Sequence, residues 1–163
     1  MAESAGWVVD ASVAVKWLVP EPLTAEARRV LRAAEAGRIR IHVPEIWLSE
    51  VANSLLKKTR RPGPDRIDAP MAARMLASAR SLGVAVHSHG PLVAAAFALA
   101  CGSGLSLYDA LYAALALSRD SFLVTADDRL LAGARDAGLG DRAVALRDVA
   151  AALDPPASAG RPG

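Results

Sequence analysis

The sequence of 163 residues predicts an α/β protein in which a central parallel sheet of four to five strands lies between two helical layers, a three-layer α/β/α sandwich. Two observations predict this fold. Short apolar segments typical of buried strands alternate along the chain with longer segments whose apolar residues recur every three to four positions. Because whole helices separate the strands, the connections are crossovers, and crossovers join parallel strands that are buried on both faces.

Two strands are predicted in the first quarter of the chain. The apolar run Gly6–Asp10 is typical of a buried strand, and apolar and polar residues alternate over Arg38–Val43. Helical spacing between them predicts a short helix over Ser12–Leu18 and a longer one over Thr24–Ala36. Gly37 is placed to end the longer helix.

The middle of the chain contains its least regular segment. A helix is predicted from about Glu45 to Lys58, with one apolar stripe. Thr59–Pro70 contains three prolines among charged residues, and we interpret it as a long loop because neither side could form a core alone. A helix over Met71–Leu82 and a short third strand over Val84–His87 follow.

The C-terminal part repeats the alternation of helix and strand. The expected elements are helices over Pro91–Ala100 and Ser106–Ser118, a strand over Ser121–Thr125, a helix over Asp127–Ala137, a fifth strand over Ala143–Leu146 and a last helix from about Arg147. We expect residues 1–153 to form a single domain. Residues 154–163 have no apolar pattern and are expected to be a disordered tail.

Composition excludes some classes of protein and leaves others open. The formal net charge of +2 does not by itself indicate a nucleic-acid partner. The single cysteine, Cys101, excludes a disulfide framework and favours a reducing, cytoplasmic location; beside the apolar run Val93–Ala100 it is expected to be a buried, inert thiol. The first residues lack the pattern of a secretory signal, and the longest apolar stretch is about half of a membrane span, so no membrane association is expected.

The predicted topology places two acidic residues at one point of the sheet. If the second and third strands lie on one side of the first and the fourth on the other, the strand order reverses between the first and fourth. Ligand sites in such sheets form there, at the carboxyl ends of the strands. Asp10 directly follows the first strand, and Asp127 lies two residues beyond the fourth.

Each candidate acid also has a purely structural interpretation. Ser106 and Asp109 have the spacing of a capping box, and Asp127 would be stabilised by the dipole of the helix that it begins. Asp10 could begin the helix that follows it, and Glu50 could be a solvated residue of an amphipathic helix. Taken singly, the structural interpretation is favoured for every one.

Taken together, the four carboxylates favour a catalytic metal site. Their mutual repulsion would raise their pKa values unless a cation neutralised them. Carboxylate oxygens without a cysteine or histidine cluster suit Mg²⁺ or Mn²⁺ better than zinc. The predicted catalytic and metal-binding residues are therefore Asp10, Glu50, Asp109 and Asp127. Asn53 shares a helix face with Glu50.

Four segments carry a resemblance to a known family. In this order and spacing, Val8–Ser12, Glu50–Asn53, Tyr108–Ala116 and Leu123–Leu130 resemble the PIN-domain nucleases, and specifically the VapC-like toxins of bacterial toxin–antitoxin pairs. The resemblance implies a PIN-like α/β/α sandwich, Mg²⁺- or Mn²⁺-dependent endonucleolytic cleavage of RNA and, usually, a homodimer. It also implies a cognate antitoxin that covers the acidic site.

The resemblance also assigns roles to individual residues. Asp10 and Asp109 correspond to the principal metal ligands, while Glu50 and Asp127 complete the cluster directly or through water. The groups expected to support these ligands are Ser12, Asn53 and Thr125.

Basic residues and histidines near the site have two interpretations each. A basic cluster lies at a helix end and in the loop after it, and consists of Lys57, Lys58, Arg60 and Arg61, with Arg66 further on. These side chains could be solvated, or they could contact RNA phosphates. His87 and His89 are expected to be loop histidines rather than zinc ligands, because no further cysteine or histidine partner is apparent.

Two other functions remain to be compared with the nuclease. A PIN-fold RNA- or protein-binding module without catalysis would be expected to lack one or more of the acids, and all four are present. A phosphotransfer receiver domain would need an acid after the third strand and a lysine after the fifth, and neither position fits.

Overall fold

The computed structural model describes residues 5–154, which contain one parallel five-stranded sheet. The strands are β1 (Ala5–Val9), β2 (Ile39–Pro44), β3 (Ala85–His87), β4 (Phe122–Thr125) and β5 (Ala143–Ala145). They are arranged in the order β3-β2-β1-β4-β5, and every neighbouring pair is parallel. The predicted fold class is confirmed, and so is the reversal of strand order between β1 and β4.

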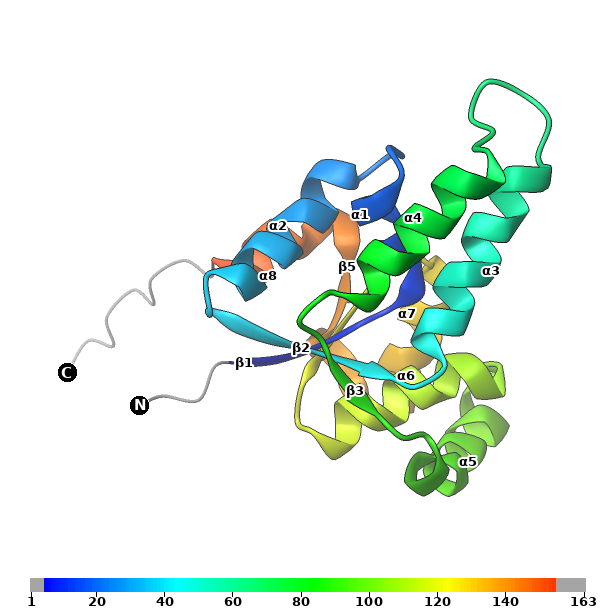
Figure 1. The fold of residues 1–163 in the computed structure, drawn as a ribbon. Helices are drawn as coiled ribbons and strands as arrows, with labels where there is room; N and C mark the ends of the chain where they lie inside the picture. Colours follow the sequence, from blue (N-terminus) through cyan, green and yellow to red (C-terminus); the bar gives the residue numbers. More distant parts are fainter. Residues whose placement is uncertain (1–4, 155–163) are drawn as a thin grey trace.

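Helices cover both faces of the sheet, as the sandwich prediction requires (Figure 1). They are α1 (Ala11–Leu18), α2 (Thr24–Glu35), α3 (Trp47–Arg60), α4 (Ala69–Arg80), α5 (Val93–Ser103), α6 (Leu107–Ser118), α7 (Asp128–Ala134) and α8 (Val149–Leu153). Helices α5 and α6 pack together on one face, while α1, α2, α4 and α8 lie on the other. Helix α3 packs against both α1 and α4, and α7 packs against β4 and β5.

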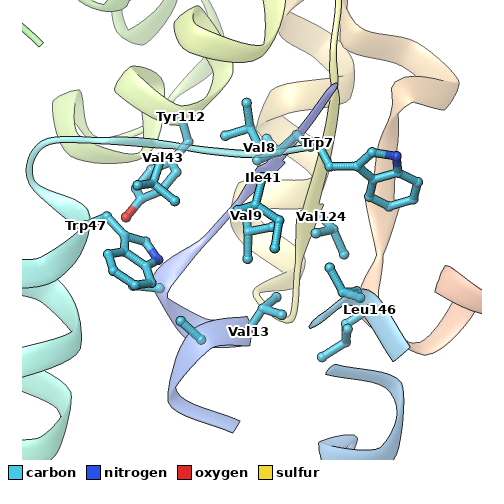
Figure 2. Packing of buried hydrophobic residues seen from close by; sticks show 14 of the residues in the cluster. Trp7, Val8, Val9, Val13, Ile41, Val43, Trp47, Tyr112, Val124 and Leu146 are labelled. Carbon is cyan, nitrogen blue, oxygen red and sulfur yellow. The ribbon is translucent and has the colours of Figure 1, made fainter. Parts of the chain in front are cut away.

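The core lies around the central strand β1. Trp7, Val8 and Val9 are all buried, because β1 has a strand on each side and helices over both faces. The ring of Trp7 stacks on that of Phe122 in β4, with 5.0 Å between ring centroids. In Figure 2, aliphatic side chains of β1, β2 and β4 gather around Val9, and Tyr112 and Trp47 lie together at one side. This packing holds the carboxyl ends of β1 and β4 side by side.

Several predicted boundaries were wrong. The loop predicted over Thr59–Pro70 is shorter, because α3 continues to Arg60 and α4 begins at Ala69, where Asp68 caps it by accepting a bond from the Met71 amide at 2.7 Å. The helix predicted over Asp127–Ala137 ends at Ala134 and passes into a wider turn in which Gly138 has a φ of 108°. Only glycine adopts that backbone conformation without strain.

Cys101 is exposed, so the prediction of a buried thiol was also wrong. Helix α5 is apolar on all sides and extends to Ser103, but it lies at the surface and only Ala96 is fully buried. Most of this helix is alanine, whose small side chain gains little from burial, so apolar composition alone did not indicate which face is covered.

The predicted tail over residues 154–163 lies almost entirely outside the described residues. Asp154, its first residue, is described, and its carboxylate accepts a bond from the Arg38 guanidinium at 2.9 Å. Within residues 5–154 no single helix is long and apolar enough to cross a membrane. The segments Gly90–Ser103 and Leu107–Ser118 reach that length and composition only together, across a bend of 113°.

Candidate active site

Asp10 lies at the centre of the candidate site, between the ends of β1 and β4. Its backbone amide continues the sheet by donating to the Val124 carbonyl at 3.1 Å. Its carboxylate is 7% exposed and accepts hydrogen bonds from the hydroxyls of Ser12 (2.5 Å) and Thr125 (2.9 Å). The start of α1 and the end of β4, far apart in the sequence, are therefore joined through one buried acid.

The two hydroxyl groups also fix the backbone that follows β4. Ser12 accepts a bond from the Ala126 amide at 3.1 Å, and Thr125 accepts one from the Asp127 amide at 2.9 Å. Ser12 and Thr125 therefore both bond to Asp10, and they place the start of α7 beside it. Both were predicted supporting residues.

Glu50 approaches the same point from α3. Its side chain is half-buried, and the hydroxyl of Tyr112 on α6 donates a close hydrogen bond to one of its carboxylate oxygens. Tyr112 is completely buried, and it is not among the site residues predicted from the sequence. Its position three residues after Asp109 on the same helix was the available signal, since residues at that spacing share a face.

Asp109 performs the structural role that its spacing predicted. In the first turn of α6, its amide donates to the Ser106 hydroxyl at 3.1 Å, and that hydroxyl donates to the Asp109 carboxylate at 2.8 Å. The same carboxylate is close enough to act electrostatically on both Asp10 and Glu50. The capping interpretation of this residue is therefore confirmed, and its role in the site stays a prediction.

Electrostatics show that three of the four acids converge. Burial raises the pKa of Asp10, and the charge of Asp109 adds to the effect although hydrogen bonds from Ser12 and Thr125 oppose it. Burial also raises the pKa of Glu50, with further contributions from the charges of Asp10 and Asp109. In residues 5–154 no lysine or arginine forms an ion pair with any of these three. Among the described residues, therefore, no lysine or arginine compensates their negative charge.

Asp127 stands apart from this group. One of its carboxylate oxygens caps α7 by accepting bonds from the amides of Arg129 (2.8 Å) and Leu130 (3.3 Å). Its connection to Asp10 runs through Thr125. Asn53 is exposed, and none of the hydrogen bonds found in the described residues joins it to a carboxylate. The structure therefore brings Asp10, Glu50 and Asp109 together and places Asp127 beside them, and it shows no bond that joins Asn53 to this group in the described residues.

The donor set fits a divalent cation in its chemistry. Clustered carboxylate oxygens without a positive partner are the ligands that Mg²⁺ and Mn²⁺ prefer, and a cation would remove the repulsion that raises the pKa values of Asp10 and Glu50. As the side chains lie, however, no three acidic, histidine or cysteine groups among residues 5–154 are close enough to hold one ion. Side-chain movement would have to complete the coordination.

A cleft with basic walls opens beside the acids. It has a volume of about 560 Å³ and is lined by Ser12, Val15, Lys16, Glu21, Ser54, Lys57, Lys58, Arg61, Ala126, Asp127 and Asp128. Three of the predicted RNA-contacting residues, Lys57, Lys58 and Arg61, line this cleft, and Arg60 does not. Sequence reasoning missed Lys16 and Glu21, because only the packing of α1 against α3 brings them to the basic end of α3.

The description of His87 as a loop histidine was wrong, whereas the strand predicted over Val84–His87 contains it correctly. His87 is the last residue of β3, and its Nε2 atom lies 2.9 Å from Nδ1 of the buried His42 on β2. The guanidinium of Arg119 lies 3.2 Å from the other ring nitrogen of His87. This histidine pair belongs to the sheet and is separate from the acidic site.

Comparison with known proteins agrees with this geometry. The PIN-domain family model matches residues 7–135. The chain belongs to the PIN-domain family. Ribonuclease VapC3 of Pyrobaculum aerophilum is 37% identical over 125 residues, a match that covers 76% of this chain and 90% of that protein. Ribonuclease VapC9 of Mycobacterium tuberculosis is 37% identical over 123 residues, covering 76% and 87%. These relatives identify the chain as a VapC-like PIN-domain protein.

A solved structure supports the same fold. The crystal structure of PAE2754 from Pyrobaculum aerophilum aligns with a TM-score of 0.65 at 25% sequence identity, covering 94% of this chain and 93% of that one. The α/β/α sandwich predicted from the sequence is therefore a PIN fold.

The hydroxyl of Thr125 provides a test of how Asp10 is held in this PIN-domain site. Replacing Thr125, which is 1% exposed, by Val removes one donor to Asp10 and leaves the Asp127 amide without its acceptor. We expect Thr125→Val to lower any metal-dependent nuclease activity about 10- to 100-fold, as does loss of groups that orient metal ligands. Thr125→Ser keeps the hydroxyl and is the matched control, so equal activity of the two variants would contradict the role assigned here. The measurement is the initial rate of cleavage of a labelled RNA.

Proposed function

We propose that this protein is a Mg²⁺- or Mn²⁺-dependent endoribonuclease and the toxin component of a toxin–antitoxin pair. The observation that carries the proposal is the group of uncompensated carboxylates, Asp10, Glu50 and Asp109, at the point where the strand order reverses. Two relatives, which this chain matches over most of their length, are named ribonuclease VapC. Their names support RNA as the substrate.

The residues of the chain have distinct parts in the proposed reaction. Asp10, Glu50 and Asp109 would hold the cation, with Asp127 completing the set directly or through water. When bound there, a divalent cation polarises a phosphate oxygen and lowers the pKa of the water that attacks phosphorus. Ser12 and Thr125 keep the Asp10 carboxylate oriented, and Tyr112 does the same for Glu50.

The bond changes of the proposed hydrolysis balance without a further reactant. The oxygen of water forms a bond to phosphorus, and the bond from phosphorus to the 3′ oxygen breaks. The leaving oxygen takes up a proton and becomes a 3′-hydroxyl, while the phosphate stays on the 5′ end of the other product. The basic side chains of Lys57, Lys58 and Arg61 would bind the phosphates of the strand in the adjoining cleft.

We also propose that the protein acts in the cytoplasm as a homodimer and is held inactive by an antitoxin that covers the acids. The names of the VapC relatives support the antitoxin partner.

An exposed surface without charged residues over Gly90–Tyr108, with Phe97 63% exposed, supports association with a second copy. The molar mass from light scattering, measured as the protein elutes from a size-exclusion column, tests the dimer. The mass of a monomer at every protein concentration would overturn it.

Cleavage of single-stranded RNA by the purified protein tests the proposed activity. We expect cleavage in Mg²⁺ or Mn²⁺, loss of cleavage in excess EDTA and recovery when the metal is added back. The products should carry 5′-phosphate and 3′-hydroxyl ends. Cleavage that continues unchanged in EDTA would overturn the metal dependence. RNA binding without cleavage in any metal would favour a PIN-fold binding module.

A further inference from the structure

Two lysines from different helices meet at a single glutamate in the wall of the basic cleft. Lys16 lies on α1 and Lys58 at the end of α3, and Glu21 lies in the connection between α1 and α2. The Lys16 ammonium is 3.0 Å from one Glu21 oxygen, and the Lys58 ammonium contacts the other. We call Lys16 and Lys58 the lysine pair.

This arrangement is held firmly in place. The side chains of Lys16 and Lys58 are only 13% and 16% exposed, and that of Glu21 is 23% exposed. The backbone of Glu21 is fixed by Thr24, whose hydroxyl accepts from the Glu21 amide at 2.9 Å and donates to its carbonyl at 2.8 Å. Burial opposes ionisation of Glu21, but its bonds with Lys58 and Lys16 outweigh this effect and lower its pKa below the usual range.

The charges of the cluster do not cancel. Glu21 neutralises one ammonium group, so the lysine pair retains one positive charge in a partly buried place. Ordering two long side chains costs conformational entropy, and removing their charges from water costs further free energy. Glu21 joins α1 to α3 through both lysines but can neutralise only one of the two ammonium groups, so the remaining positive charge suits an anionic ligand.

The position of the lysine pair identifies the kind of anion. Lys16 is one helical turn after Ser12, whose hydroxyl holds Asp10, and both line the 560 Å³ cleft with Asp127. The Cβ atoms of residues at this spacing lie about 5–6 Å apart on one helix face, so Ser12 and Lys16 face the same cleft. An anion bound by the lysine pair would thus lie in the same cleft as the groups that hold Asp10.

A second cleft continues the same path. It has a volume of about 460 Å³, shares Glu21, Lys58 and Arg61 with the first, and extends to Pro64, Asp65, Arg66 and Ile67. Pro64–Ile67 belong to the loop between α3 and α4, which projects beyond the ends of both helices (Figure 1). A path that runs from the acids past the lysine pair to this loop suits a polynucleotide strand better than a free phosphate.

We propose that Lys16 and Lys58, held by Glu21, bind one backbone phosphate of the RNA next to the phosphate that is cleaved. This inference rests on the proposed function, since RNA is the ligand in both. Each ammonium donates a hydrogen bond to a phosphate oxygen, while Glu21 keeps the two nitrogen atoms together. The bound phosphate fixes the position of the strand relative to Asp10, so Glu21 is a positioning residue.

RNA binding in EDTA, measured by fluorescence anisotropy over a series of KCl concentrations, tests the lysine pair without cleavage. For a single strand, the plot of log affinity against log salt loses about 0.7 in slope for each phosphate contact removed. We expect this loss in Lys58→Met, where Lys16 and Glu21 still neutralise each other, and in the double variant Lys16→Met/Lys58→Met. Lys16→Arg/Lys58→Arg keeps both charges and should keep the wild-type slope.

Arg142→Met is the matched control for loss of one positive charge. Arg142 pairs with the exposed Asp120 just before β4 and β5 begin, at the opposite edge of the sheet from Asp10. We expect this variant to bind RNA as the wild type does. Circular dichroism melting confirms that each compared variant is folded. If the double variant is not folded, the salt dependence of Lys58→Met alone tests the phosphate site.

The outcomes separate this inference from the proposed function. A Lys58→Met variant that is folded and has the wild-type slope and affinity overturns the phosphate site, while metal-dependent cleavage by the wild type would still stand. If the slope falls as expected but RNA is not cleaved in any metal, the phosphate site is supported and the nuclease is overturned. A wild type that neither binds nor cleaves RNA overturns both.

Discussion

Replacing Asp10 by Asn is expected to lower the rate of RNA cleavage on the order of 10³-fold or more, because it removes the most buried carboxylate of the site. Asn has nearly the same shape, and its side-chain oxygen still accepts the bonds from Ser12 and Thr125. Burying a carboxylate without a cation costs free energy, so Asp10→Asn is expected to unfold at the same temperature as the wild type or higher. Loss of activity with retained stability is the signature of a chemical role.

Asp141→Asn is the matched control for this variant. Asp141 is exposed in the turn before β5, away from the carboxyl ends of β1 and β4, and its replacement is expected to leave the cleavage rate unchanged. Rates are compared under single-turnover conditions in Mg²⁺ and in Mn²⁺. An Asp10→Asn variant that keeps more than a tenth of the wild-type rate would show that this carboxylate is not required for RNA cleavage.

Acidification from pH 7 to pH 4 is expected to lower the free energy of unfolding by about 3 kcal/mol through His42. Burial lowers the pKa of His42 to about 4 in the folded protein, with smaller contributions from His87, Arg119 and Arg40. In the unfolded chain a histidine titrates near its model value of 6.5. Well above pH 6.5 both states are neutral at this residue. Between pH 6.5 and 4 only the unfolded chain takes up the proton, so stability is lost as the pH falls.

His42→Gln separates this effect from that of other titrating groups. Burial also lowers the pKa of His87, so its protonation acts in the same direction, and the two rings titrate as a bonded pair. Urea unfolding at several pH values gives the free energy for the wild type and the variant. We expect the wild type to lose more stability than His42→Gln between pH 6.5 and 4. Parallel pH dependences of the two proteins would contradict the assignment to His42.

The sequence predicted those parts of the fold that depend on local patterns. Alternating and continuous apolar segments marked all five strands. The helices between them indicated parallel strands, while the strand order entered only as an assumption, which the structure bears out. The same reasoning placed Asp10 at the reversal between β1 and β4, where the structure finds it buried. Asp109 could be placed at the start of a helix by the capping spacing of Ser106.

Features that depend on contacts between distant residues were not predictable in this way. Tyr112 and Glu50 are 62 positions apart, and His42 and His87 are 45 apart, so no local pattern pairs them. Glu21 joins α1 to α3 only after those helices pack together. Asp127 caps α7 with one oxygen, as its place at the start of a helix predicted, and its role as a metal ligand stays a prediction. The coordination of the cation itself stays a prediction.

Binding of Mn²⁺ to the purified protein tests the central claim, that the converging carboxylates form one cation site. The electron paramagnetic resonance signal of free Mn²⁺ falls as the ion binds, so a titration gives the number and affinity of sites. We predict saturable binding by the wild type, unchanged binding by Asp141→Asn, and loss of that binding in both Asp10→Asn and Asp109→Asn. Equal Mn²⁺ binding by the wild type and Asp10→Asn would contradict the account.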